Sequence, residues 1–502
     1  MTVYNFNLGI GWASSGVEYA QAYRAEAFRQ EGIPARFIYT DLILYENLIH
    51  MTENIGIKAE EVIWLYTWFT DLKPSPTTFT LEDLLATLAD KPVRQTRDGK
   101  VVRLYFEDSK RYATVYLKNE TEDYVERVEY VDNNLLIRKD YYTYTRAFSE
   151  YYAPKDNAAH AYQRRFYNED GSMAYEEICD EKGDSTFIFK DKIIYSKEEL
   201  ITLFVQSLNL TADDIVILDR ETGQGQQVFE QHRPAKLGVV IHAEHYSENH
   251  VSDDYILWNN YYDYQFTNSD EVDFFIAATP VQQKIVQEQL KKYNGRDAKI
   301  YNIAVGNLDQ LRRPQKKRKP YSLVSVSRLA SEKHLNWVVE AVVKAKKTLP
   351  ELTLDIYGKG GEEEALKKLI TQLGAQDYIH LKGHQDVTEI YTQYQAYISG
   401  STSEGFGLSL LEAIGSGLPI IGFDVPYGNQ TFVDEGENGY LVESNANTQS
   451  KQRVQDLSER IVTLFTKDDI AAFQEHSYQK ASEYLTANIS RKWKQLVEEQ
   501  VK

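Results

Sequence analysis

The sequence predicts an α/β fold with two doubly wound domains and an antiparallel β-meander inserted into the first of them. Residues 3–28 and 397–423 each predict a buried strand, a glycine-rich loop and a helix, the pattern of a parallel sheet that binds ligands beyond its strand ends. Residues 91–194 form short alternating aromatic runs separated by polar turns, which is typical of antiparallel strands. The length of 502 residues also exceeds what one hydrophobic core supports.

Shifts in composition along the chain give the domain boundaries. The first doubly wound domain is predicted at residues 1–75 and, after the inserted meander at 76–195, again at 196–318. The second domain is predicted at 319–485 and a final helix at 486–502. Residues 312–320, rich in Arg, Lys and Pro, are predicted as a solvated linker, with contact to membrane phosphates as the alternative.

The bulk composition excludes several classes of protein. The formal net charge of −19 argues against a nucleic-acid partner, which needs a basic face. The lone cysteine, Cys179, cannot form an intramolecular disulfide and fits a reducing compartment, so the protein is expected in the cytoplasm. The N-terminus lacks the basic and apolar regions of a signal peptide, and no apolar run is long enough to span a bilayer.

The stretch 401–421 carries the most specific signal of function. Gly405 and Gly407 lie on the predicted loop, where a missing Cβ lets backbone N–H groups approach a ligand. Glu404 precedes them and Glu412 lies in the first turns of the following helix; a carboxylate accepts hydrogen bonds from adjacent hydroxyls. We therefore predict a holder for a nucleotide sugar, in which one carboxylate faces a sugar ring and the other a ribose. The alternative is a plain turn whose glutamates are solvated.

The first glycine-rich loop, residues 9–16, lies at the first strand-to-helix turn, where doubly wound folds bind ligands. The backbone N–H groups of the next residues begin the helix and could face a pyrophosphate; these residues are Gly16, Val17, Glu18 and Tyr19. A lone glycine loop is a weak signal, and a simple tight turn is the alternative.

Cations at the start of the second domain are predicted to stabilise a departing diphosphate. Arg328 and Lys333 follow the strand predicted at 321–327. The chain contains no Asp-x-Asp triplet, the usual metal holder for nucleotide sugars, so we expect no metal or other cofactor and assign this charge to the side-chain cations. After a later strand, the backbone at His384 and Gln385 could recognise a uracil edge.

Two histidines end the buried strand of the first domain at 237–242. His242 lies at the carboxyl end of the strand, where it could donate to a sugar hydroxyl or a phosphate oxygen. The His-x-x-His spacing to His245 also suggests a metal, but no third ligand is evident and strand geometry turns the two rings apart. We favour sugar contact for His242, and for His245 a structural or acceptor-side place.

Tyrosine is unusually frequent, with 37 copies concentrated in the first half of the chain. An antiparallel sheet must bury one face but can expose the other, and tyrosine suits an interface because an apolar ring carries a polar tip. The surplus tyrosines could cover that second face, which makes the meander a candidate docking surface for a partner protein. A sheet without a partner is the alternative.

The segment from Glu404 to Glu412 resembles the E-x7-E segment of retaining glycosyltransferases of the GT-B architecture, in which two Rossmann-like domains face a cleft. Residues 321–441 carry this match, with Arg328 and Lys333 in register. Over its whole length the chain looks like the glycosyltransferase A subunits of the accessory secretion system of Gram-positive bacteria. Residues 4–12 and 240–245 and the inserted meander carry this narrower match.

The narrower resemblance implies an activity, partners and a site. It implies transfer of N-acetylglucosamine from UDP-N-acetylglucosamine to Ser or Thr hydroxyls of a serine-rich-repeat adhesin, the first step of its O-glycosylation, with a B subunit that holds the substrate. It implies that Gly16, Val17, Glu18, Tyr19, His384 and Gln385 contact UDP. It implies that His242, Glu404, Gly405, Phe406 and Gly407 contact the amino sugar. Such a protein would act in the cytoplasm or at the cytoplasmic face of the membrane.

Two other functions fit the same architecture. A catalytically silent, adhesin-binding chaperone of this fold would have eroded site residues, whereas Arg328, Lys333, Glu404 and Glu412 are all present. A transferase that builds a lipid-linked or cell-wall polysaccharide would keep those residues, but the tyrosine-rich meander favours a protein partner.

Overall fold

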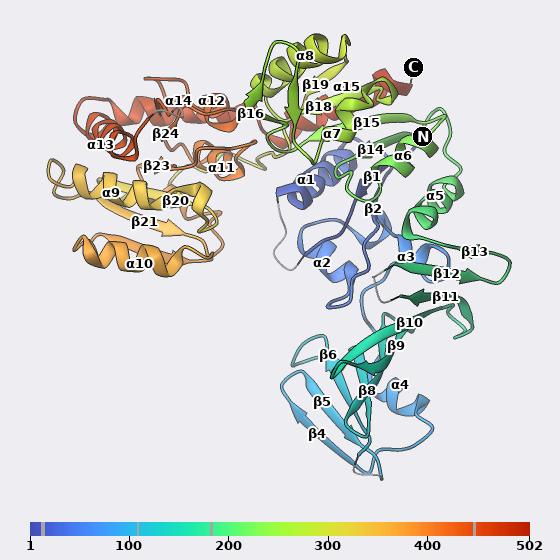
Figure 1. Cartoon of the computed structure of the whole chain (residues 1–502). Coiled ribbons are helices and arrows are strands. Elements are labelled where there is room, and N and C mark those ends of the chain that lie inside the picture. The colour runs from blue at the N-terminus through green and yellow to red at the C-terminus, as the bar shows by residue number, and fades with distance from the viewer. Residues whose placement is uncertain (12–15, 108–109, 181–183, 445–447, 502) are drawn as a thin grey trace. The chain divides into compact units, whose positions relative to one another are not determined.

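Figure 1 shows the computed structural model, which describes residues 1–11, 16–107, 110–180, 184–444 and 448–501. The chain divides into two compact units, residues 1–238 with 500–502 and residues 239–499. Both contain parallel strands that alternate with helices, and the first also contains an antiparallel sheet, so the predicted α/β fold with an inserted meander is confirmed. None of the described helices has both the length and the apolar character that a membrane span needs.

The first unit opens with strands and helices in alternation. These elements are β1 (Val3–Asn7), α1 (Gly16–Gln30), β2 (Ala35–Tyr39), α2 (Leu48–Asn54), η1 (Ala59–Glu61), β3 (Val62–Trp64) and α3 (Leu65–Trp68), continued after the insert by α5 (Lys197–Ser207), β14 (Ile215–Leu218), α6 (Gly225–Gln231) and β15 (Lys236–Ile241). Strands β14, β1, β2 and β3 are parallel, with Phe6 opposite Ile38 on one side and Leu218 on the other. All three side chains are buried, as strands covered on both faces require.

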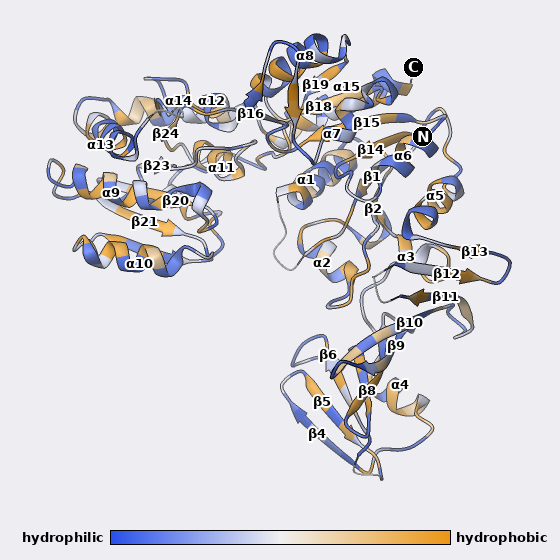
Figure 2. Ribbon diagram, viewed as in Figure 1, coloured by the Kyte–Doolittle hydropathy of each residue, from blue (hydrophilic) through white to orange (hydrophobic). Residues whose placement is uncertain are grey.

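The insert is one antiparallel sheet in which each strand pairs with the next along the chain. Its elements are α4 (Leu81–Thr87), β4 (Arg94–Asp98), β5 (Val101–Tyr105), β6 (Tyr112–Leu117), β7 (Val125–Asp132), β8 (Leu135–Tyr142), β9 (Arg146–Lys155), β10 (Ala158–Tyr167), β11 (Met173–Cys179), β12 (Ser185–Phe189) and β13 (Ile193–Ile194). Helix α4 packs on β5 and β6, where Leu84 joins Val102 and Val115 in a buried cluster. Edge strand β4 is hydrophilic and exposed throughout, which protects this edge from pairing with other chains (Figure 2).

Aromatic rings on neighbouring strands of the insert stack into a continuous row. Ring centroids are 4.3 Å apart between Tyr141 and Phe148, and 4.5 Å apart between Phe166 and Tyr175. Tyr66 of α3 stacks on Phe166 with 5.7 Å between centroids, so this face of the sheet lies against the first domain. These tyrosines therefore pack the buried face of the sheet against its own chain, and the docking role suggested for tyrosines on the other face stays a prediction.

Other tyrosines of the insert are stacked under arginines. The guanidinium carbon of Arg94 lies 4.1 Å from the ring centre of Tyr105, and that of Arg127 lies 4.2 Å from the ring centre of Tyr116. Each such pair contributes about 0.5–1 kcal/mol where it is exposed. Arginine and tyrosine are both enriched in protein interfaces, so these paired side chains, rather than the stacked row, are the part of the insert that suits a partner.

The second unit begins within β15 and completes the first doubly wound domain. Its next elements are β16 (Tyr246–Val251), β17 (Ile256–Trp258), α7 (Asp263–Thr267), η2 (Ser269–Glu271), β18 (Phe274–Ala277), α8 (Pro280–Asn294) and β19 (Ile300–Asn302). Strands β15, β18 and β19 lie side by side in that order. Helix α8 starts with Pro280 after Thr279, whose hydroxyl accepts a hydrogen bond from the N–H of Gln282, so local capping fixes where it begins.

The second doubly wound domain lies within this unit except for residues 500–501, the end of its last helix, which belong to the first unit. Its elements are β20 (Ser322–Val326), η3 (Ser331–Lys333), α9 (Leu335–Ala345), β21 (Thr353–Tyr357), α10 (Glu363–Gln372), β22 (Ile379–Gly383), η4 (Tyr391–Gln393), β23 (Ala396–Ile398), α11 (Leu408–Gly415), β24 (Ile420–Phe423), α12 (Gly428–Phe432), β25 (Gly439–Val442), α13 (Ser450–Thr466), α14 (Ile470–Ser482) and α15 (Thr486–Val501). The strands are parallel in the order β22-β21-β20-β23-β24-β25. The order reverses between β20 and β23, the point where such sheets bind ligands.

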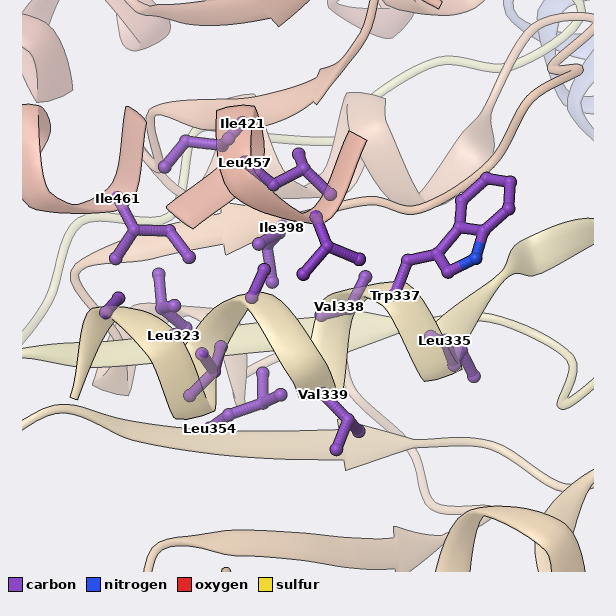
Figure 3. Packing of buried hydrophobic residues seen from close by; sticks show 14 of the residues in the cluster. Leu323, Leu335, Trp337, Val338, Val339, Leu354, Ile398, Ile421, Leu457 and Ile461 are labelled. Carbon is purple, nitrogen blue, oxygen red and sulfur yellow. The ribbon is translucent and has the colours of Figure 1, made fainter. Parts of the chain in front are cut away.

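The core of the second domain fixes the strands on either side of this reversal point. Figure 3 shows side chains of α9, among them Val338, packed with Ile398 of β23 and Leu457 of α13. All three are completely buried. Burying a side chain of this size stabilises the fold by about 1.5–3 kcal/mol. Leu323 of β20 belongs to the same cluster, so this core holds β20 and β23 beneath the loops that follow them.

The basic segment at 312–320 is mostly exposed, as predicted for a solvated linker, with the exception of Arg318. Arg318 is 7% exposed and donates to the carbonyl oxygens of Tyr394, at 2.8 Å, and Ser416, at 2.6 Å. Burial lowers the pKa of Arg318 below its ordinary value. The guanidinium therefore acts as a structural anchor between the segment and the second domain, and within this run only the exposed side chains remain for contacts with phosphates.

Candidate functional site

The loop between β23 and α11 is held on both sides by backbone contacts that only glycine allows. A Cβ on Gly405 would lie 2.7 Å from the carbonyl oxygen of His242. A Cβ on Gly428 would lie 2.2 Å from the carbonyl oxygen of Phe406. Gly407, which directly precedes α11, has a φ of 84°, in the left-handed region. The loop backbone therefore lies against the end of β15 on one side and the start of α12 on the other.

Lys333 and Glu404 form an ion pair at the reversal point of the second sheet. Nζ lies 2.7 Å from Oε2, and the two side chains are 14% and 19% exposed. Lys333 lies in η3, after β20, and Glu404 follows β23; because these strands are neighbours, their carboxyl ends bring the two side chains together. The predicted diphosphate cation thus lies directly beside the predicted sugar carboxylate. Arg328 is 78% exposed and pairs with Glu332 at 3.0 Å.

Glu412, in α11, is held by a tyrosine from η4. The hydroxyl of Tyr391 donates to Oε2 of Glu412 at 2.8 Å, and Tyr391 is 1% exposed. Burial raises the pKa of Glu412 above the ordinary carboxyl value, and the hydrogen bond from Tyr391 partly offsets this rise. A carboxylate held through one oxygen can accept adjacent ribose hydroxyls through the other, which is the role predicted for Glu412.

Replacing Tyr391 by Phe is expected to move the pH dependence of donor binding. The lost hydroxyl stabilises the ionised form of Glu412, so its removal raises the pKa of this carboxyl further. An ionised carboxylate accepts from the ribose, so affinity is present above this pKa and is lost as the pH falls through it. KM for the UDP-sugar should be measured from about pH 5 to about pH 8. As the pH is lowered, KM should begin to increase at a higher pH in the variant than in the wild type. If KM begins to increase at the same pH in the variant and in the wild type, Glu412 does not hold the ribose.

His242 follows β15 on a segment that two side chains, those of Tyr262 and Gln282, hold in place. The backbone N–H groups of His242 and Ala243 both donate to the Tyr262 hydroxyl, at 2.9 and 3.1 Å. Gln282 of α8 donates to the carbonyl oxygen of Ala243 at 2.9 Å. His245 is completely buried, which suits the structural one of the two places predicted for it, structural or acceptor-side. The contact between Gly405 and His242 brings two of the predicted sugar-binding positions together.

The predicted diphosphate contacts at the start of α1 lie in the first unit. Gly16 and Tyr19 are exposed, whereas Glu18 is 5% exposed and pairs with Arg220 at 3.2 Å. The side chain of Glu18 thus belongs to the interior, and like Val17 it could meet a diphosphate only through its backbone. Residues 12–15 of the predicted glycine-rich loop lie outside the described part of the chain.

Three further predicted contacts have distinct surroundings. His384 and Gln385 are exposed beyond β22, and the amide of Gln385 donates to the carbonyl oxygen of Lys382 at 2.8 Å. Phe406 is 4% exposed and its ring centroid lies 5.1 Å from that of Phe432. Any contact of Phe406 with a sugar must therefore come from its backbone.

The predicted site residues do not form a metal-binding cluster in the described structure. Asp434, Glu437 and His476 could each offer one ligand atom, within 4.8 Å of one another, but none of them is a predicted site residue. One oxygen of Asp434 is already paired with Lys480 at 2.7 Å. The absence of a metal from the reaction stays a prediction.

Sequence reasoning missed the groups that hold the site residues in place. Tyr391, Tyr262 and Gly428 carry no local signal, because each contacts a residue that lies at least twenty positions away in the chain. An aromatic position in an α/β domain looks like ordinary core until its partner is known.

At the reversal point of a doubly wound sheet, a carboxylate is paired with a lysine, and a second carboxylate lies on the next helix. This is the arrangement of a GT-B glycosyltransferase. The family model of group 1 glycosyl transferases matches residues 308–461, and that of the GtfA extended beta-sheet domain matches residues 94–191. The GtfA subunit of the UDP-N-acetylglucosamine–peptide N-acetylglucosaminyltransferase of Streptococcus gordonii is 56% identical over 99% of both chains. This chain belongs to the GtfA family.

Two solved structures agree with this assignment. The pneumococcal O-GlcNAc transferase GtfA, in complex with UDP and GlcNAc, is 53% identical and superposes with a TM-score of 0.94 over 100% of this chain and 99% of its own. A chain of a GtfA/B complex is 55% identical, with a TM-score of 0.95 over 100% of both chains.

Proposed function

We propose that this protein transfers N-acetylglucosamine from UDP-N-acetylglucosamine to Ser or Thr hydroxyls of a serine-rich-repeat adhesin, as the first step of its O-glycosylation and with retention of configuration. The observation that supports this most is the Lys333–Glu404 pair beside Gly405, whose backbone lies against His242. A sugar at this loop would meet a carboxylate, an imidazole and a cation. Relatives from two streptococci are named for peptide N-acetylglucosaminyl transfer.

In this proposal, positioning and leaving-group electrostatics carry the reaction. The bond from the sugar C1 to the diphosphate oxygen breaks, the acceptor oxygen bonds to C1 from the same face, and the hydroxyl proton passes to the departing diphosphate. Arg328 and Lys333 stabilise the negative charge of the leaving group. Glu404 and His242 hold the sugar, and Glu412 holds the ribose. The scheme needs neither a covalent nucleophile nor a metal.

The proposed partner is a B subunit, because a solved relative is part of a GtfA/B complex. The arginine–tyrosine pairs of the insert are the surface whose chemistry suits such a contact. We place the protein in the cytoplasm, since its one cysteine fits a reducing compartment. Lys316 and Lys317, exposed beside the buried Arg318, are available for contact with the inner face of the membrane.

Release of UDP tests the proposal. UDP-N-acetylglucosamine is incubated with a Ser/Thr-rich acceptor polypeptide, with and without the B subunit, beside UDP-glucose as the control donor. We expect turnover of the amino sugar, strengthened by the B subunit. Binding of the acceptor without turnover of either donor would make the protein a chaperone of the same fold. Transfer to a polyol phosphate polymer but not to the polypeptide would favour the polysaccharide alternative.

A further inference from the structure

A buried histidine that follows β15 of the first doubly wound domain is hydrogen-bonded to a buried tyrosine of the second. His245 follows β15 of the first domain, and Tyr427 precedes α12 of the second. The Tyr427 hydroxyl lies 3.1 Å from Nδ1 of His245, and Nε2 of His245 lies 2.7 Å from Oε1 of Gln289 in α8. His245 is 0% and Tyr427 1% exposed, so solvent cannot replace these hydrogen bonds.

The partners of His245 fix the direction of both bonds. Oε1 of Gln289 can only accept, so Nε2 of His245 donates to it and Nδ1 is left to accept from the Tyr427 hydroxyl. Burial lowers the pKa of His245 to about 4, which keeps the ring neutral and Nδ1 able to accept at neutral pH. One defined chain of donors and acceptors therefore runs from α8 through His245 to Tyr427.

The backbone of Tyr427 connects this chain to the site loop. The N–H groups of Tyr427 and Gly428 both donate to the carbonyl oxygen of Glu404, at 2.8 and 3.0 Å. Next along the loop, Gly405 approaches the carbonyl oxygen of His242 so closely that a Cβ would lie 2.7 Å from it. From His242 the chain returns to His245 three residues later. These contacts close a ring between the two segments that carry His242 and Glu404.

We propose that Tyr427 and His245 are positioning residues for sugar transfer: their hydrogen bond sets the separation between His242 and Glu404, the two predicted sugar contacts that lie on different domains. This inference rests on the proposed function. Neither residue touches the donor. Loss of the bond lets the loop and the end of β15 move apart, while the contacts of the second domain to the nucleotide stay intact. A misplacement of about 1 Å at a reacting centre can cost about a hundredfold in rate.

The test uses the full chain and removes one link at a time. Tyr427→Phe deletes the hydroxyl and keeps the ring. His245→Gln keeps a donor towards Gln289 and loses the acceptor for Tyr427, whereas His245→Asn places an oxygen near the position of Nδ1 and keeps that acceptor. Tyr440→Phe is the matched control: Tyr440 is also buried in the second domain and donates to Asp468 at 2.6 Å, away from the ring.

We expect kcat/KM for UDP-N-acetylglucosamine to fall about tenfold or more in Tyr427→Phe and in His245→Gln, and less in His245→Asn. The double variant Tyr427→Phe/His245→Gln should lose no more than either single variant, because both remove the same bond. Affinity for UDP, measured by calorimetry, should stay within about twofold of the wild type in all of them. Tyr440→Phe should keep kcat/KM and change only the melting temperature.

Two results would overturn the inference: additive losses in the double variant, or a loss of UDP affinity as large as the loss of kcat/KM, which marks a merely structural role. Failure of the proposed function has a different signature, since the wild type itself then releases no UDP. In that event the positioning role is tested by binding instead of kcat/KM. The readout is the ratio of the dissociation constants of UDP and UDP-N-acetylglucosamine. A ratio that Tyr427→Phe leaves unchanged overturns the positioning role, and a changed ratio supports it.

Discussion

Replacing Lys333 by Met is expected to lower kcat about a hundredfold to a thousandfold while changing the affinity for UDP much less. Removal of one preorganised group that stabilises charge in a transition state costs about this much. Lys333 is held 2.7 Å from Glu404, so its charge is fixed in place and needs little reorganisation as the diphosphate departs. Methionine keeps the apolar part of the side chain and removes the ammonium group. Single-turnover rates and UDP calorimetry on the same preparation separate the two effects.

A stability loss must be kept apart from this effect on the rate. The Lys333–Glu404 pair is partly buried, so its loss should cost between the values for exposed and for buried pairs, about 1–3 kcal/mol. Lys344→Met, at an exposed lysine of α9 that bonds to Gln455 at 3.2 Å, is the matched control and should retain full activity. If UDP affinity falls as far as kcat in Lys333→Met, the lysine binds the ground state and does not act on the leaving group.

The loop at 404–407 could be predicted because its signals are local. In the structure Gly405 lies against the carbonyl oxygen of His242 and Gly407 has a left-handed backbone. The approach of a ligand to the N–H groups of this loop stays a prediction. The spacing of Glu404 and Glu412 depends on one loop and one helix, so it can be predicted without knowledge of tertiary contacts. The same holds for the parallel strands that flank them, whose continuous apolar runs mark burial on both faces.

The burial of polar and aromatic side chains could not be predicted, because it depends on partners that are distant in sequence. Arg318 lies in a run that has the composition of a solvated linker, but the carbonyl oxygens of Tyr394 and Ser416 draw it into the interior. Tyr175 looks like surplus surface tyrosine, but its ring stacks on Phe166 and its hydroxyl donates to the backbone of Tyr66. Composition gave the amount of aromatic surface and not the face that it covers.

Replacing Asp219 by Asn is expected to cost about 3–5 kcal/mol of unfolding free energy, because it removes a carboxylate charge that is paired with a buried arginine. Arg24 of α1 donates to Asp219 through Nη1 at 2.9 Å and through Nη2 at 2.7 Å, and the two side chains are 1% and 0% exposed. Asparagine has the same shape and keeps the packing, but it removes the charge and replaces one accepting oxygen by an NH2 group, which cannot accept from Arg24 or Gln21. Denaturant unfolding measures the loss, and Asp123→Asn, in an exposed pair with Arg97, should leave the midpoint unchanged.

The double variant Arg24→Met/Asp219→Leu shows whether this pair serves more than stability. Apolar side chains of similar volume often replace a buried ion pair without loss, so the double variant should recover most of the stability that Asp219→Asn loses. The pair also fixes α1, whose first residue is Gly16, against the end of β14. If the double variant is stable but binds UDP more weakly than the wild type, the ion pair orients the helix start for the diphosphate. If stability and UDP affinity both return, burial alone is enough to hold α1 in place.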